Sequence, residues 1–256
     1  MGKLNKDDVV IKSLNKKVFV LLLVMTSVLL SQVVMAKVDT KKLVNNVETA
    51  IGRYYTETFD IKAESNGKII LGGEVNSMYD RIRIFDIVST VPGVMSIENR
   101  LIVDTPELPD DIIMDNIQTS LGINPAIQEP DRIKVAVSNG LVMLSGEVSN
   151  QREKTMAETV VSWQQGVKGI ENDIEVLSHA QAVSDENLTI ILNEIMKNQF
   201  HLYKKVTFTI ADGVVTLKGT APRLWDKNKI AEEFIRVMGA KKAVNNVTVI
   251  TDDVTL

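Results

Sequence analysis

The chain has 256 residues and a formal net charge of −4, with no cysteine and only two histidines. The absence of cysteine excludes disulfides, thiolate metal sites and the lipid attachment of a lipoprotein. His179 and His201 lie far apart without an acidic partner at ligand spacing, which argues against a histidine metal centre or a Ser-His-Asp triad. We therefore expect no catalytic residues, no metal and no cofactor.

Residues 1–36 are typical of an export signal. Five lysines precede the apolar run 18–30, and Val34-Met35-Ala36 then matches a small-x-Ala cleavage pattern. The run is short for a membrane span, which needs about 20 residues. We expect cleavage before Lys37 and a periplasmic protein. The alternative is an uncleaved inner-membrane anchor over residues 18–36, and both readings place the rest of the chain beyond the membrane.

The remaining sequence repeats itself at a fixed interval. Nine residues recur every 73 positions: Gly73, Gly146 and Gly219; Gly93, Gly166 and Gly239; and Asn99, Asn172 and Asn245. Chance does not place nine residues in three registers at one spacing, so the chain is one small module written three times. We place the copies at residues 39–104 (repeat 1), 110–177 (repeat 2) and 184–251 (repeat 3).

Each copy is predicted to begin with a helix, over about residues 39–55, 110–121 and 184–198. In the third copy Leu188, Ile191, Leu192, Ile195 and Met196 recur at helical spacing. Ser184 precedes them as a candidate N-cap. The local pattern therefore predicts an amphipathic helix at the start of each module.

A β-hairpin should follow the helix. Apolar residues alternate with polar ones on both sides of Asn66-Gly67, Asn139-Gly140 and Asp212-Gly213, dipeptides that favour type I′ turns. The first copy has one more residue before its turn, so we expect a bulge or a longer loop there. The returning strand is predicted to end at Gly73, Gly146 or Gly219, where glycine permits a close backbone approach or a kink.

A second helix and a last strand complete each copy. The helices are predicted over about residues 77–91, 150–164 and 223–238, with Gly93, Gly166 and Gly239 at C′ in the left-handed conformation. The last strands, 97–103, 170–176 and 244–250, follow a helical crossover and should run parallel to one hairpin strand. The fold class is α+β, with three tandem αββαβ modules, each a three-stranded mixed sheet packed by two helices.

This pattern resembles a known family, the BON domain. The resemblance is carried by the element order, by Asn139-Gly140-Leu141-Val142-Met143-Leu144-Ser145-Gly146-Glu147-Val148 and by Gly166-Val167-x-x-Ile170-x-Asn172. Copy three departs from it at Thr220, in place of glutamate, and at Ala240, in place of valine. The resemblance implies an exported, non-enzymatic protein associated with phospholipid membranes or envelope maintenance. Two copies are the commoner arrangement, and this chain has three.

Charge distinguishes the third copy. Residues 37–109 carry a net charge of −2, residues 110–182 carry −6, and residues 183–256 carry +1. Anionic headgroups would repel the first two copies, so we expect a lipid surface on the third, where cations surround an indole that suits the membrane interface. The expected lipid-binding residues are Arg223, Leu224, Trp225, Lys227, Lys229, Lys241 and Lys242. The alternative is that these lysines form an ordinary solvated face and that Trp225 packs on a neighbouring repeat.

Trp163 occupies a position where the other copies have Thr90 and Arg236. A tryptophan among surface residue types suggests an inter-repeat contact or a partner contact. Taken together, the sequence predicts a non-enzymatic envelope protein that binds an anionic phospholipid membrane and supports envelope integrity or osmotic stress tolerance. The alternative is a structural or assembly module for an envelope protein partner. Export and the net charge of −7 after residue 36 argue against nucleic acid.

Overall fold

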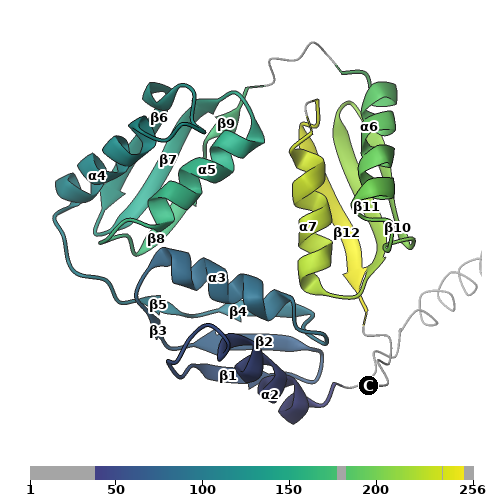
Figure 1. Ribbon diagram of the computed structural model, residues 1–256, viewed down its shortest axis with the longest axis horizontal. Helices are drawn as coiled ribbons and strands as arrows, with labels where there is room; N and C mark the ends of the chain where they lie inside the picture. Colours follow the sequence, from purple (N-terminus) through teal and green to yellow (C-terminus); the bar gives the residue numbers. More distant parts are fainter. Residues whose placement is uncertain (1–37, 178–182, 238, 251–256) are drawn as a thin grey trace, which may run out of the picture. The chain divides into compact units, whose positions relative to one another are not determined.

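The computed structural model describes residues 38–177, 183–237 and 239–250 (Figure 1). Three units with the same αββαβ order lie within these residues, and the predicted α+β class is confirmed. The expected export signal, residues 1–36, lies outside the described residues. Within the described ranges, no helix combines the length and the apolar character that crossing a bilayer requires.

Repeat 1 forms a three-stranded sheet in the order β1-β2-β4. Strand β1 is antiparallel to β2, and β4 is parallel to β2, as predicted from the helical crossover. Farther along the chain, two short strands, β3 and β5, form a second parallel pair. The elements are α2 (Thr40–Ile51), β1 (Asp60–Ala63), β2 (Lys68–Gly72), β3 (Glu74–Val75), α3 (Met78–Ser89), β4 (Ser96–Asn99) and β5 (Ile102–Val103).

Repeats 2 and 3 have the same topology, with orders β6-β7-β8 and β10-β11-β12. Repeat 2 contains α4 (Asp110–Gly122), the 3₁₀ turn η1 (Pro130–Arg132), β6 (Ile133–Ser138), β7 (Leu141–Val148), α5 (Gln151–Ser162), β8 (Gly169–Asn172) and β9 (Glu175–Val176). Repeat 3 contains α6 (Asp185–Asn198), β10 (Val206–Ala211), β11 (Val214–Ala221), α7 (Leu224–Ile235) and β12 (Lys242–Val249).

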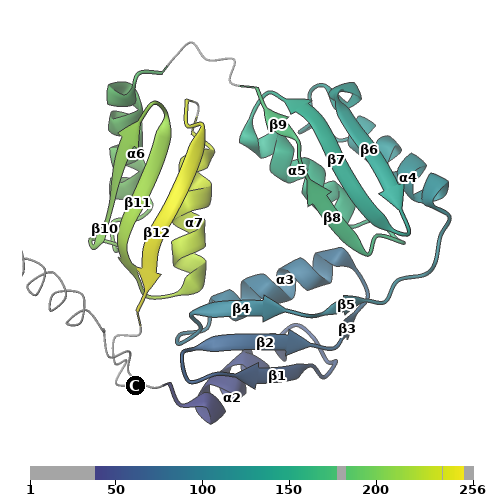
Figure 2. The ribbon, with the colours of Figure 1, turned by 180° about the vertical axis from the view of Figure 1, so that it is seen from behind.

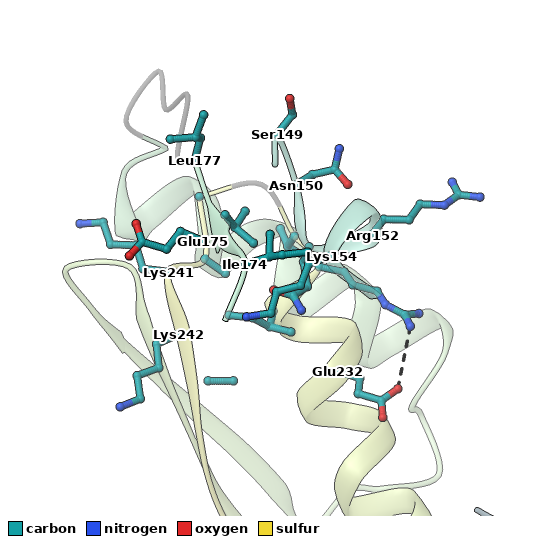
Figure 3. Close-up of a pocket in the computed structure, with 18 of the residues that line it drawn as sticks. Ser149, Asn150, Arg152, Lys154, Ile174, Glu175, Leu177, Glu232, Lys241 and Lys242 are labelled. Atoms are coloured by element: carbon teal, nitrogen blue, oxygen red, sulfur yellow. Dashed lines mark ion pairs between the residues drawn. The ribbon is translucent and has the colours of Figure 1, made fainter. Parts of the chain in front are cut away.

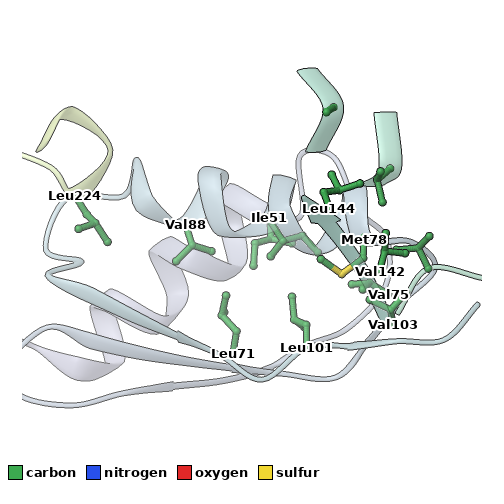
Figure 4. Packing of buried hydrophobic residues seen from close by; sticks show 14 of the residues in the cluster. Ile51, Leu71, Val75, Met78, Val88, Leu101, Val103, Val142, Leu144 and Leu224 are labelled. Atoms are coloured by element: carbon green, nitrogen blue, oxygen red, sulfur yellow. The ribbon is translucent and has the colours of Figure 1, made fainter. Parts of the chain in front are cut away.

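In each repeat both helices cover the same face of the sheet and leave the other face open (Figures 1 and 2). The second helix contributes a pair of fully buried side chains four residues apart: Ile84 and Val88, Ala157 and Val161, and Ile230 and Phe234. Figure 4 shows part of the repeat 1 core, where Val88 and Ile51 from the helices point toward Leu71 and Leu101. The second helix therefore packs the same side against the sheet in every repeat.

The hairpin turns behave as their sequences predict. Asn139 and Gly140 have φ values of 51° and 77°, and Asp212 and Gly213 have 52° and 77°, as a type I′ turn requires. Repeat 1 instead makes the expected longer loop between β1 and β2. In repeat 2 the Asp110 carboxylate accepts hydrogen bonds from the turn amides of Asn139 and Gly140, at 2.8 and 3.0 Å. This contact fastens the first helix to the hairpin.

The returning strand does not end at the recurring glycine in repeats 2 and 3. β7 and β11 continue two residues beyond Gly146 and Gly219, which corrects the prediction. The expected close approach is confirmed, because a Cβ on Gly219 would lie 1.9 Å from the Lys205 carbonyl oxygen. Gly219 also has a φ of +117°, which L residues rarely adopt. The glycine therefore lets a strand pass close to its neighbour without interrupting it.

The second helices end earlier than predicted. Their last residues are Ser89, Ser162 and Ile235, so Gly93, Gly166 and Gly239 lie three residues beyond the C-cap rather than at C′. The final turn of α3 tightens into i to i−3 hydrogen bonds, such as Val91 N to Val88 O at 3.0 Å. Gly239 has the expected positive φ, +96°. These glycines turn the chain into the last strand and do not themselves end the helix.

Candidate functional site

Each repeat carries an acidic residue in the first turn of its second helix, again at the 73-residue interval: Asp80, Glu153 and Asp226. Glu153 and Asp226 are 2% and 1% exposed. The sequence analysis missed this set, although the interval that revealed the glycines contains it. Buried carboxylates at a recurring position are candidates for either chemistry or structure, and their partners distinguish the two.

The hydrogen-bond partners of these carboxylates indicate a structural role. The Asp226 carboxylate accepts hydrogen bonds from Arg223 Nε and Nη2, at 2.7 and 2.8 Å, and from the Tyr203 hydroxyl at 2.7 Å. Asp80 accepts from the hydroxyls of Tyr55 and Ser77, at 3.0 and 2.6 Å. In these two repeats the acid therefore joins the loop after the first helix to the start of the second.

The recurring asparagines also have structural roles. The Asn245 side-chain amide donates to the Lys227 carbonyl oxygen at 2.8 Å and accepts from the Val247 amide at 3.2 Å. Asn99 and Asn172 make the same pair of contacts in their repeats. Each asparagine thus fastens the second helix to the last strand. Since the recurring residues build the scaffold, functional differences must lie where the repeats diverge.

Two of the predicted lipid-binding residues, Arg223 and Lys229, are already engaged in repeat 3. Arg223 forms the bidentate contact with Asp226, which raises the pKa of its guanidinium, and lies 5.9 Å from the centre of the Trp225 ring. Lys229 pairs with Glu233 at 3.0 Å and Glu232 at 3.6 Å. Leu224 is 8% exposed. Arg223 and Lys229 therefore have acidic partners within repeat 3, and the part of these residues in lipid binding stays a prediction.

The structure also separates Lys241 and Lys242 from Trp225. Lys242 pairs with Val214, the first residue of β11, whereas α7 begins after Ala221, the last residue of β11. The two lysines therefore lie beyond the carboxyl end of α7, and Trp225 lies in its first turn. A 12-residue helix is about 18 Å long. Figure 3 shows the exposed Lys241 and Lys242 side chains at the start of β12, and Glu232 on α7 in its ion pair with Arg236.

Other cations lie at the Trp225 end of repeat 3. The Tyr203 contact with Asp226 and the close approach of Lys205 to Gly219 hold the loop 199–205 beside the start of α7. Lys204 and Lys205 are exposed on this loop, and Leu202 is 77% exposed. Lys218, exposed on β11, pairs with Thr207 one residue into β10.

We call this group the repeat 3 pole, and its members are Leu202, Lys204, Lys205, Lys218, Trp225 and Lys227. Trp225 and Lys227 are half-buried. The ion pairs found among the described residues involve none of its four lysines. The pole therefore combines uncompensated positive charge with exposed apolar surface.

The other repeats lack this combination at the same positions. Repeat 2 has Glu129, Asp131, Arg132, Ser145, Arg152 and Lys154. With the extra residue before its turn taken into account, repeat 1 has Glu57, Thr58, Gly72, Tyr79 and Arg81 at the positions of Lys204, Lys205, Lys218, Trp225 and Lys227. In repeat 2, Arg132 is paired with Glu129 at 2.8 Å. The positive pole is thus specific to repeat 3. It arises from the residue types at these positions, because the three repeats share one backbone topology.

Trp163 is the C-cap residue of α5, with its side chain 57% exposed. Its assignment to an inter-repeat or partner contact stays a prediction. Across the described ranges, no group of three or more histidine, cysteine, aspartate or glutamate side chains is placed to hold a metal ion.

The hydrogen bond from the half-buried Tyr203 to Asp226 predicts an alkaline limit to stability. Burial, and then the hydrogen bond to Asp226, raise the pKa of Tyr203 above its ordinary value of about 10. A tyrosine hydroxyl that keeps its proton in the folded state makes its full contribution to the free energy of unfolding below pH 10. This contribution is lost as the pH rises through the pKa of the folded state. We expect the free energy of unfolding to fall above pH 10 and Tyr203→Phe to flatten this fall. Urea titrations from pH 8 to 11.5 measure this pH dependence of the free energy of unfolding. The exposed Tyr54→Phe is the control, and an unchanged slope in Tyr203→Phe would contradict the assignment.

Comparison with known proteins identifies the family. The family model for the BON domain matches residues 39–105, 109–178 and 184–251. The chain is 29% identical over 125 residues to osmotically-inducible protein Y of Escherichia coli (strain K12), and the match covers 45% of this chain and 61% of that protein.

Solved structures give weaker matches. The C-terminal domain of CdsD, a structural protein of the type III secretion system of Chlamydia trachomatis, is 16% identical with a TM-score of 0.22, over 83% of this chain and 100% of that one. The PrgH periplasmic domain is 8% identical with a TM-score of 0.20, over 75% and 95%. Scores this low carry no argument about fold or function. The three matches to one family model, which together cover most of the chain, show that it belongs to the BON domain family.

Proposed function

We propose that this chain is an exported, periplasmic, non-enzymatic envelope protein whose third BON repeat binds anionic phospholipid surfaces. We further propose that this binding supports envelope integrity under osmotic stress. Membership of the BON family and the similarity to an osmotically inducible protein support the setting. The repeat 3 pole carries the lipid assignment, because its four lysines, Leu202 and Trp225 all lie at the same end of repeat 3.

The chemistry of the pole fits a membrane interface. Each lysine near an anionic surface contributes about 1 kcal/mol, and an indole is favoured at the headgroup level. The exposed Leu202 side chain adds apolar area that can enter the acyl boundary. Four lysines alone correspond to a dissociation constant in about the millimolar range, so the apolar residues are needed for useful affinity. Binding should therefore be modest and should weaken as salt rises.

Vesicle binding tests the proposal directly. Residues 37–256, which contain every described helix and strand, are mixed with vesicles of phosphatidylcholine alone or with 30% phosphatidylglycerol added, at low and physiological salt. We expect binding to the anionic vesicles only. In the variant Lys204→Asp/Lys218→Ser, each residue takes the identity found at the same position of repeat 2. This change alters the charge by three units, about 3 kcal/mol, so we expect about a hundredfold weaker binding.

A charge-matched control separates a site from net charge. Lys241→Asp/Lys242→Ser makes the same three-unit change at the opposite end of α7 and should weaken binding much less. Equal losses in the two variants would show that only total charge matters, and the assignment to the pole would fail. If residues 37–256 bind no vesicle of either composition, the lipid function fails, and an envelope protein becomes the partner to seek.

A further inference from the structure

The open face of the repeat 2 sheet carries an apolar patch. Leu141 and Met143 on β7 are 59% and 47% exposed, and Ala136 on β6, opposite Met143, is exposed as well. Leu141 also reaches the third strand, because a Cβ built on its β8 neighbour Gly169 would lie 2.7 Å from Leu141 Cδ2. The patch therefore crosses all three strands on the face that α4 and α5 leave uncovered (Figure 2).

Four of the six counterparts of Ala136, Leu141 and Met143 in the other repeats are charged or hydroxyl side chains. In repeat 1 the counterparts of Ala136 and Leu141 are Lys62 and Lys68, which pair with Asp60 at 3.1 Å and Glu98 at 2.6 Å. In repeat 3 the counterparts of Ala136 and Met143 are Thr209 and Thr216. The two remaining counterparts, Ile70 in repeat 1 and Val214 in repeat 3, are apolar and half-buried. Repeats 1 and 3 thus form with one half-buried apolar residue each, and the fold does not require the three exposed ones of repeat 2. An exposed apolar group of this kind marks an interaction surface.

The charges beside the patch indicate its partner. Lys134 lies two residues from Ala136 on β6, and Glu171 lies opposite Met143 on β8, both exposed on the same face by strand alternation. One edge of the patch is therefore positive and the other is negative. A membrane is a poor occupant, because residues 110–182 carry a net charge of −6 and anionic headgroups would repel them.

We propose that this face binds the same face of a second copy of the chain. A two-fold axis parallel to the strands places β7 over β7 of the partner, so that Leu141 and Met143 of both copies meet in the centre. The same operation places β6 over β8, and Lys134 then faces the Glu171 side of the other copy. The two residues differ by two positions along the strands, about 7 Å, which a lysine side chain spans. The surface is thus self-complementary, as an isologous interface requires.

The expected dimer is weak and reversible. A stable interface buries about 800 Å² on each partner, and one face of a three-stranded sheet with two large apolar side chains falls short of that. Sedimentation equilibrium of residues 37–256 over a thousandfold concentration range should therefore show a monomer–dimer transition. Leu141→Lys/Met143→Thr gives these positions the residues found in repeats 1 and 3, which keeps the fold, and should weaken dimerisation at least tenfold.

A charge exchange provides the decisive test. Lys134→Glu and Glu171→Lys should each weaken dimerisation several-fold, because each places like charges across the axis. The double variant Lys134→Glu/Glu171→Lys restores opposite charges and should recover the parent dissociation constant. Circular dichroism verifies that each variant is folded. A parent protein that stays monomeric throughout, or a double variant that does not recover, overturns the proposal and favours a different protein as the occupant. Vesicle binding by Leu141→Lys/Met143→Thr should be retained, which keeps this test separate from that of the lipid function.

Discussion

Replacing Gly219 by valine is expected to destabilise repeat 3 by at least about 3 kcal/mol. The residue has a φ of +117°, and a Cβ there would lie 1.9 Å from the Lys205 carbonyl oxygen and 2.9 Å from its carbon. Both neighbours are backbone atoms of Lys205, the residue directly before β10, so neither can rotate away as a side chain could. The cost of the strained backbone at this φ and the cost of displacing the strand therefore add. Urea unfolding monitored by far-ultraviolet circular dichroism measures the loss.

Gly122 is the matched control for this substitution. It is the last residue of α4, and a Cβ there would meet no heavy atom within 4 Å. Gly122→Ala should be neutral or stabilising by up to about 1 kcal/mol, since alanine is the better helix former. If Gly219→Val unfolds at the same urea concentration as Gly122→Ala, the close approach of β11 to Lys205 does not determine the stability of the repeat.

Asp226→Ala is expected to cost about 2–4 kcal/mol, the second largest effect. The carboxylate is 1% exposed and accepts three hydrogen bonds from Arg223 and Tyr203. Its removal leaves the Tyr203 hydroxyl without its acceptor and Arg223 without its counter-charge. Because 38% of the Arg223 side chain is exposed and can reach water, the cost should remain below that of breaking a fully buried ion pair. Thermal or urea unfolding measures the change.

The comparison for Asp226 is an exposed ion pair. Asp60 contacts Lys62 at 3.1 Å, with side chains 64% and 69% exposed, and Asp60→Ala should cost less than about 1 kcal/mol. Asp226→Asn keeps an acceptor for Tyr203 and should fall between the two alanine variants. An Asp226→Ala protein as stable as Asp60→Ala would show that the buried acid is not what joins the loop 199–205 to α7.

The order of helices and strands could be predicted from the sequence because its signals are local. Helical periodicity in α6, the Ser184 cap and the turns Asn139-Gly140 and Asp212-Gly213 each act within a few residues. The Ser184 side chain accepts from the Asn187 amide at 3.3 Å, as a cap should. The repeat strengthened each signal by presenting it three times. The basic character of the third copy could also be predicted from the sequence, because it follows from composition alone.

Element ends were less predictable because tertiary contacts determine them. Pairing with β12 carries β11 past Gly219, although glycine by itself disfavours a strand. The second helix ends through tightened hydrogen bonds ahead of Gly239, whose positive φ serves the turn into β12. Neither outcome depends on the glycine alone.

The sequence by itself determined that this chain is three BON modules and that the third is the basic one, because repetition and charge need no coordinates. Only the tertiary structure decided which cations act together. The register between Val206 and Gly219 brings Lys204, Lys205 and Lys218 to the Trp225 end, and the parallel pairing of Lys242 with Val214 sends Lys241 and Lys242 to the other. Strand register joins residues that lie far apart along the chain, and no local pattern in the sequence encodes it.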